Sequence, residues 1–209
     1  MQPVLETCSS DGFSLWPVAS IEAYGFMPLS GALSPEEVGA AVMCIAVRNG
    51  VAPEPDGCPP GLVDPLGSFL YGLLTMDPLF AAGGLQVTDT TTGAELLPGC
   101  CNGLDERSDW LEVLDGDGRA SFGHGPAPLA ERLGDSVRLT IDAEQDDSPV
   151  IELPADELRR LLIGAESDLA DFLQPTAAWA ARHLPGYATP VSAALARALA
   201  LPTPVVPQP

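Results

Sequence analysis

The sequence predicts an α+β fold in which a small, mostly antiparallel sheet of about four strands is packed by several long helices. Three observations predict it. Apolar residues recur at helical spacing in several stretches, they alternate with polar residues in other short stretches, and 21 glycines and 22 prolines imply many connecting loops. The length allows a single α+β domain over residues 1–201, followed by a disordered Pro-rich tail over residues 202–209.

The first helix is predicted from its capping residues. Ser34 is the expected N-cap, Pro35 occupies the first helical position, and Glu37 completes a capping box. The dipeptide Asn49-Gly50 ends the helix. Because residues 38–47 are apolar nearly all round, we expect this helix to be central and buried.

A long loop, a second helix and a hairpin are expected next. The loop covers residues 51–64, where four prolines and two glycines prevent regular structure. The helix begins at Asp64-Pro65 and carries leucines at helical spacing until Asp77-Pro78 interrupts it. The hairpin covers residues 85–97, with its turn at residues 89–93.

The last third of the chain predicts two strands and then helices. Residues 137–141 alternate apolar and polar side chains, and residues 150–153 form a second strand after a polar loop. A long helix starts at Pro154 and is expected to bend or end at Pro175. Two short Ala-rich helices are expected to follow, at residues 177–184 and 191–201.

The charge of the chain excludes several classes of function. Nine arginines, no lysine and 29 acids give a net charge of −20, which disfavours nucleic acid and anionic membranes as partners and favours a protein with a basic surface. The charge can also serve solubility alone. Residues 85–160 carry 17 of the acids and six arginines. Without lysine, no Schiff-base or phosphate-loop lysine is present.

The composition also bears on location. The first ten residues have neither a basic start nor an apolar run, and the longest apolar run, Val38 to Val47, is too short to span a bilayer. Five cysteines cannot all be paired within the chain, so reduced thiols are expected. These features predict a cytoplasmic protein with no membrane partner.

The densest group of unusual residues lies between Pro98 and Pro128. It contains the run P-G-C-C-N-G-L, an acidic helix with Trp110, and the run G-H-G-P-A-P. This segment resembles a group of uncharacterised bacterial proteins with the pattern P-G-C-C-x-G-L, then Trp, then G-H-x-P-x-P. The resemblance implies no activity, cofactor or residue role that can be carried over.

The vicinal cysteines Cys100 and Cys101 have several possible roles. They can close a strained disulfide, bind a soft metal or supply a nucleophile, or one can be a buried, inert thiol in a tight turn. A zinc site would use Cys100, Cys101 and His124, with Cys58 as a fourth candidate. There is no C-x-x-C pair, and neighbouring cysteines are hard to place on one tetrahedron, so no cofactor is expected.

A cysteine-dependent hydrolase is the enzymatic alternative. It would pair Cys100 or Cys101 with a histidine, oriented by an acid or an amide. Such a histidine can equally be a surface residue or a cation near a helix end. The candidates for base and orienting group are His124, His183, Asp109 and Asn102.

The acidic helix, expected over residues 105–114, is the candidate binding surface. Trp110 either docks this helix on the sheet or joins the surface that meets a partner. The residues assigned to binding are Asp105, Glu106, Asp109, Trp110 and Glu112.

The sequence therefore favours an acidic, non-enzymatic binding or regulatory protein. An immunity-like inhibitor of a basic protein partner is the concrete version of this hypothesis, by analogy of physical type alone. The alternative is a cysteine-dependent hydrolase or a small-metal site centred on Cys100, Cys101 and His124.

Overall fold

The computed structural model describes residues 1–51 and 64–201, and within them the α+β class is confirmed. The helices are α1 (Pro35–Arg48), α2 (Pro65–Thr75), the 3-10 helix η1 (Leu104–Ser108), α3 (Asp109–Asp115), α4 (Ala155–His183) and α5 (Ala188–Ala198). The expected loop over residues 51–64 and the tail over residues 202–209 lie almost wholly outside the described residues, and the single-domain organisation stays a prediction.

The strands form two antiparallel four-stranded sheets, where the sequence predicts one sheet of about four strands. Their orders are β2-β1-β3-β4 and β5-β6-β7-β8. The bounds are β1 (Gln2–Glu6), β2 (Phe26–Pro28), β3 (Gly83–Thr88), β4 (Glu95–Leu96), β5 (Arg119–Ser121), β6 (Leu129–Leu133), β7 (Ser136–Thr140) and β8 (Val150–Pro154). The expected hairpin over residues 85–97 is β3 and β4, and the two later strands are β7 and β8.

The capping residues predicted for α1 are confirmed. The Ser34 side chain accepts a hydrogen bond from the backbone N–H of Glu37, and the Glu37 carboxylate accepts one from the Ser34 N–H at 2.8 Å. These bonds hold the pKa of Glu37 below its ordinary value. Residues 38–46 are all buried, as the apolar run predicts.

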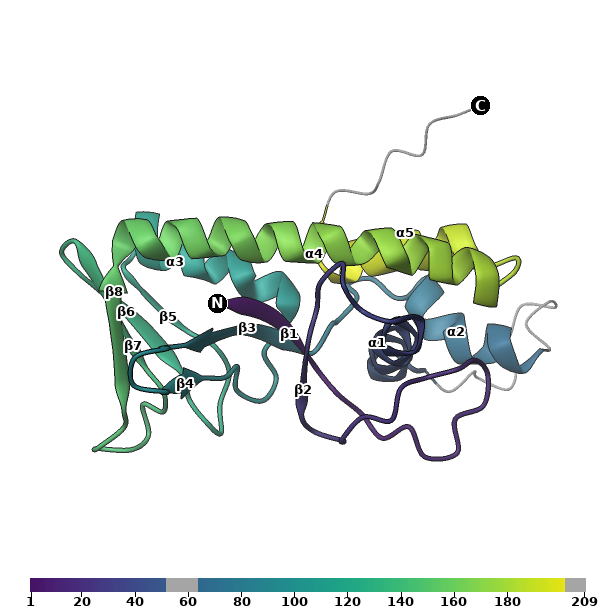
Figure 1. Cartoon of the computed structure of the whole chain (residues 1–209), viewed down its shortest axis with the longest axis horizontal. Coiled ribbons are helices and arrows are strands. Elements are labelled where there is room, and N and C mark those ends of the chain that lie inside the picture. The colour runs from purple at the N-terminus through teal and green to yellow at the C-terminus, as the bar shows by residue number, and fades with distance from the viewer. Residues whose placement is uncertain (52–63, 202–209) are drawn as a thin grey trace, which may run out of the picture.

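The third long helix does not end at Pro175, and the separate helix expected over residues 177–184 is part of it. α4 continues through Pro175 to His183 as one helix of 29 residues (Figure 1). Buried residues on both sides of the proline, Phe172 and Trp179, pack in the same core and stabilise the helix across the lost backbone donor. The Thr176 hydroxyl donates to the Phe172 carbonyl oxygen at 2.8 Å.

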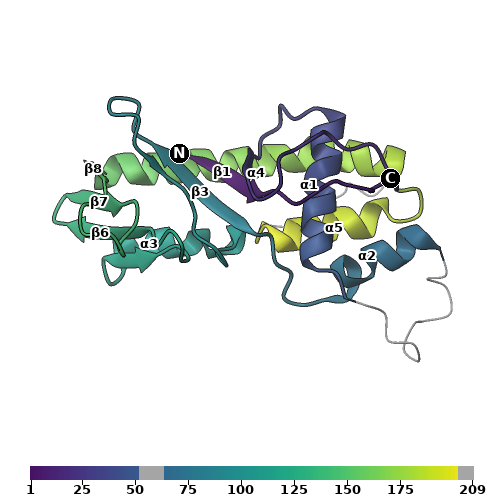
Figure 2. The same cartoon turned by 90° about the horizontal axis from the view of Figure 1, so that it is seen from below.

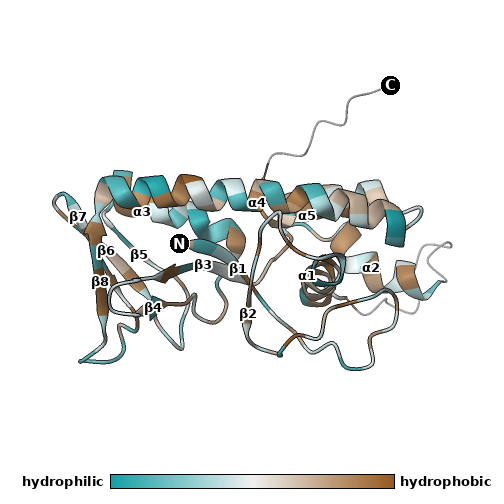
Figure 3. Cartoon of the chain, viewed as in Figure 1, coloured by the Kyte–Doolittle hydropathy of each residue, from teal (hydrophilic) through white to brown (hydrophobic). Residues whose placement is uncertain are grey.

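Two hydrophobic cores lie along α4. The N-terminal half of α4, with Leu158 and Leu162, packs with α3 and the second sheet, while the C-terminal half packs with α1 and α5. The first sheet lies between these groups, and α5 runs beside α4 (Figures 1 and 2). Hydrophilic and hydrophobic residues are mixed along α4 (Figure 3). Among residues 1–51 and 64–201, no helix has the length and apolar character needed to cross a bilayer.

Candidate functional site

Two turns bring the vicinal cysteines to His124. One turn connects β4 to η1 and carries Cys100 and Cys101, and the other connects β5 to β6 and carries His124. Cys100 and His124 face each other as an isolated antiparallel bridge. The Cys100 N–H donates to the His124 carbonyl oxygen at 2.6 Å, and the His124 N–H donates back to the Cys100 carbonyl oxygen at 3.2 Å. The backbone therefore fixes the relative position of the two residues.

Two glycines allow this close approach. A Cβ atom at Gly99 would lie 2.3 Å from the Pro126 carbonyl oxygen, and one at Gly123 would lie 2.7 Å from the Cys100 carbonyl oxygen. Gly123 also has a φ of +93°, which side chains rarely adopt. A side chain at either position would push the two turns apart.

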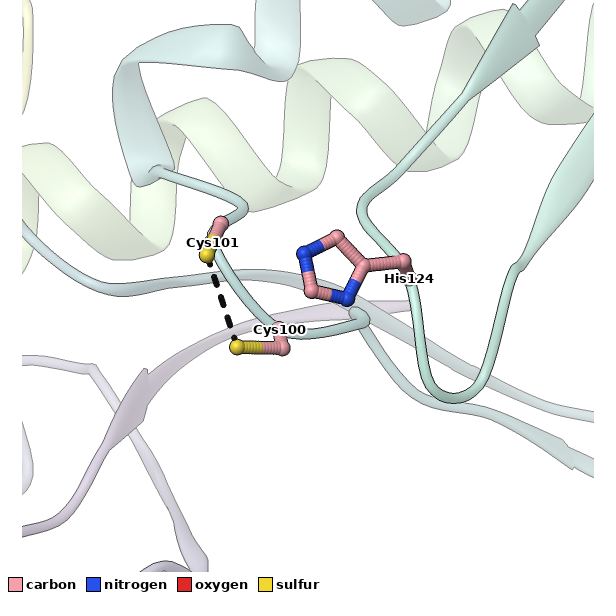
Figure 4. A group of neighbouring side chains, drawn as sticks. All are labelled: Cys100, Cys101 and His124. Carbon is pink, nitrogen blue, oxygen red and sulfur yellow. Dashed lines mark hydrogen bonds between the residues drawn. The ribbon is translucent and has the colours of Figure 1, made fainter.

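The side chains of Cys100, Cys101 and His124 converge at the surface. The two sulfur atoms are 3.4 Å apart, and one ligand atom from each of the three residues lies within 4.8 Å of the others. All three residues are exposed, and the imidazole ring of His124 points toward the sulfurs (Figure 4). The described part of the chain gives the His124 ring no hydrogen-bonding partner, so its nitrogens are available as ligands.

Cys101 has an unusual backbone conformation. Its φ is +67°, in the left-handed region that few residues other than glycine adopt. Such conformations persist where the surrounding structure holds them, and they are concentrated at functional sites. The hydrogen bond between the two thiols raises the pKa of the Cys101 thiol, and charge repulsion from Cys100 raises it further.

The other residues named for the hydrolase alternative lie elsewhere or have structural contacts. The Asn102 amide donates to the Gly83 carbonyl oxygen at 2.7 Å, and this bond joins the cysteine turn to β3. His183, at the end of α4, stacks on Trp179 with ring centroids 5.3 Å apart. Asp109 begins α3. The hydrolase stays a prediction, and Cys58 lies outside the described residues.

The acidic residues assigned to binding lie on η1 and α3. Asp105 and Glu106 are half-buried on η1, where burial raises the pKa of Glu106. Asp109 is half-buried and Glu112 exposed on α3. Trp110 is only 1% exposed, so it docks this segment on the core and offers no contact area to a partner.

A cavity of 350 Å³ adjoins the acidic helix, between η1, α3 and α4. Asp105 and Glu166 are among its lining residues, together with the exposed apolar side chains of Leu111 and Ile163. One carboxylate oxygen of Asp105 is buried without a hydrogen-bonding partner in the described structure. The exposure of Leu111 and Ile163 had no signal in the sequence, because apolar residues on a helix are expected on its buried face.

Comparison with known proteins gives no match: no family model, curated protein or solved structure matches this chain.

Proposed function

We propose that this protein binds a soft or borderline metal ion, such as Zn²⁺ or Cu⁺, through Cys100, Cys101 and His124. The observation that carries the proposal is the convergence of two sulfur atoms and an imidazole nitrogen within 4.8 Å. Thiolate and imidazole are the ligands that these ions prefer. The net charge of −20 favours any cation near the surface.

The spacing of the ligand atoms fits one ion. With zinc to sulfur bonds of about 2.3 Å, two sulfurs of a tetrahedral site lie about 3.8 Å apart. The 3.4 Å between the Cys100 and Cys101 sulfurs is close to that value. Three protein ligands leave one position for water or for a ligand from another molecule, and the exposure of the site keeps this position accessible.

Metal titration tests the proposal. Reduced protein mixed with Co²⁺ is expected to develop a thiolate-to-metal charge-transfer band that saturates at one equivalent, and Zn²⁺ is expected to displace it. Cys100→Ser, Cys101→Ser and His124→Ala should each weaken binding by about tenfold or more, since even outer partners of metal ligands contribute on that scale. Cys8→Ser is the matched control, because Cys8 lies outside the cluster, and it should bind as the parent does. Absence of the band, or full binding by Cys100→Ser/Cys101→Ser, would overturn the proposal.

The cavity beside the acidic helix favours a second candidate function. Here the protein is an immunity-like binding protein, and its partner presents a basic surface with an apolar side chain that enters the cavity between α3 and α4. Exposed Leu111 and Ile163 supply the apolar contact, and the acids of η1 and α3 supply the charge. Because the protein is proposed to work with free thiols, its expected compartment is the cytoplasm.

Capture from native lysate at low and high salt tests this second function. The charge-reversing variant of Asp105, Glu106, Asp109 and Glu112 should lose the captured partner, and Leu111→Ala should weaken it. The control variant reverses Glu144, Asp146 and Asp147 in the exposed loop between β7 and β8, and it should retain the partner. Equal capture by both variants would exclude the acidic helix as the binding surface.

A further inference from the structure

A second pair of thiols is formed by cysteines outside the candidate metal cluster. Cys8 follows β1 and Cys44 is on α1, and their sulfur atoms are 3.0 Å apart. The backbone N–H of Cys8 also donates to the Cys44 sulfur at 3.2 Å. Both cysteines are free thiols in the structure, so two sulfurs that are 36 positions apart in the sequence are already in contact.

The Cys8–Cys44 contact lies where the side-chain spacing of an extended chain matches that of a helix. Alternate side chains of an extended chain point to the same side, so Glu6 and Cys8 face one way. Side chains four positions apart on a helix also share a face, so Cys44 and Arg48 face one way at a similar spacing. Arg48 forms an ion pair with Glu6 beside the Cys8–Cys44 contact. The chain after β1 is therefore attached to α1 at two adjacent points.

The two thiols differ in access and in acidity. Cys8 is half-buried, whereas Cys44 is fully buried. When both thiols are neutral, the Cys8 S–H group donates a hydrogen bond to the Cys44 sulfur. When Cys8 is ionised, the Cys44 S–H group donates a hydrogen bond to the Cys8 thiolate. This bond, with a smaller contribution from Arg48, lowers the pKa of Cys8 to about 7 against the opposing effect of burial. The same bond and burial raise the pKa of Cys44. One thiol is thus accessible and ionised near neutral pH, and its neighbour is enclosed and protonated.

We propose that Cys8 and Cys44 form a thiol–disulfide exchange site that takes small-molecule disulfides, such as oxidised glutathione, as its oxidant. The Cys8 thiolate attacks one sulfur of the small disulfide, forms a mixed disulfide and expels a small thiolate. The Cys44 sulfur then attacks the Cys8 sulfur, and the second small thiolate leaves. One of the two small thiolates takes the proton of Cys44, and the other takes a proton from water. Two protein thiols and one small disulfide become one protein disulfide and two small thiols.

The product would tie the chain after β1 to α1. A bridge between Cys8 and Cys44 closes a loop that contains β2, and closing a loop of this length is expected to raise the melting temperature by about 5–10 °C. The site is independent of the metal proposal, since neither Cys8 nor Cys44 belongs to the cluster of Cys100, Cys101 and His124.

Peptide mapping of the full-length protein tests the proposal directly. Reduced protein is incubated with oxidised glutathione near neutral pH, blocked with iodoacetamide and digested. Trypsin cannot separate the two cysteines because no Arg or Lys lies between them, so a Glu-specific protease that cuts after Glu22 and Glu37 is required. The expected product is a linked pair of peptides containing Cys8 and Cys44, absent after reduction. Linkage of Cys8 to any other cysteine, or a stable glutathione adduct on Cys8 with Cys44 free, would overturn the proposal.

Single variants test the order of attack in a background with Cys58, Cys100 and Cys101 changed to Ser. Cys44→Ala should stop at the mixed disulfide and accumulate one glutathione on Cys8. Cys8→Ser should form no adduct, because Cys44 is enclosed. An adduct on Cys44 in Cys8→Ser protein that keeps its native circular dichroism would contradict the assigned roles. If either variant fails to fold, the linked peptides from the parent protein still decide the question.

Discussion

Trp110 stacks on Phe122 with ring centroids 4.0 Å apart and planes 12° from parallel. This contact joins α3 to the turn that carries His124. The Phe122 carbonyl oxygen also accepts a hydrogen bond from the Gly99 N–H at 2.8 Å, which joins that turn to the turn of Cys100 and Cys101. The stacked pair thus connects the acidic helix with the two turns of the candidate metal site.

Removing the Trp110 ring should destabilise the protein. Trp110 is buried, and deletion of a large buried aromatic side chain costs about 3–5 kcal/mol in the free energy of unfolding, measured by urea denaturation. Leu111→Ala, at the neighbouring exposed position, is the control and should cost less than about 1 kcal/mol. Equal losses for both variants would contradict the placement of the two side chains.

Gly123→Ala should impair the metal site through the backbone. The added Cβ would clash with the Cys100 carbonyl oxygen, and the φ of +93° is strained for alanine. We expect a loss of about 1–3 kcal/mol in unfolding free energy and weaker Co²⁺ binding. Gly125→Ala is a matched control, because Gly125 also has a positive φ but open space around its Cβ position. Co²⁺ affinity that falls equally in both variants would show that the Cys100–His124 bridge does not position the ligands.

Arg107→Ala should destabilise the end of α5. Arg107 donates hydrogen bonds to the carbonyl oxygens of Leu199 at 2.6 Å and Ala200 at 2.9 Å, and burial lowers the pKa of its guanidinium. Leaving these carbonyl groups without donors should cost about 2 kcal/mol in thermal or urea unfolding. The control is Arg159→Ala, which removes an exposed ion pair with Asp115 and should cost under about 1 kcal/mol. A cost for Arg107→Ala no larger than that of the control would refute this account.

The pH dependence of the alkylation rate of Cys8 should be that of an unusually acidic thiol. Since the pKa of Cys8 is lowered from 9.0 to about 7, its rate of reaction with iodoacetamide should reach half its maximum near pH 7. Ionised Cys8 also favours the folded state, so its contribution to stability grows as pH rises from about 7 to 9 and is lost as pH falls through 7. Cys44→Ala should move the midpoint upward more than Arg48→Gln does, because the Cys44 hydrogen bond is the larger cause. A midpoint near 9 in the parent protein would refute the prediction.

The local signals in the sequence predicted the helices better than the strands. Capping by Ser34 and Asp64 depends on neighbouring residues, so both helix starts could be identified directly. The strands β2 and β5 have only three residues each, which is too short for periodicity to detect. The continuation of α4 past Pro175 had no local signal either, since tertiary packing on both sides of the proline maintains the helix.

The candidate site could be predicted only as a list of residue types. The sequence identified Cys100, Cys101 and His124, but it argued against a shared metal because neighbouring side chains usually diverge. The left-handed backbone of Cys101 and the bridge between Cys100 and His124 depend on contacts between two turns, and these contacts appear only in the folded chain. The proximity of Cys8 to Cys44 had no signal in the sequence, because it arises where the chain after β1 meets α1 in the folded protein.

The length of α4 limits how this protein can be dissected. One helix supplies side chains to both hydrophobic cores, so a truncated version that ends before residue 155 or begins after it would expose an apolar surface that normally contacts the missing half. We expect such fragments to aggregate rather than report which half binds metal or partner. Mapping of function in this chain therefore depends on single-residue substitutions in the full-length protein.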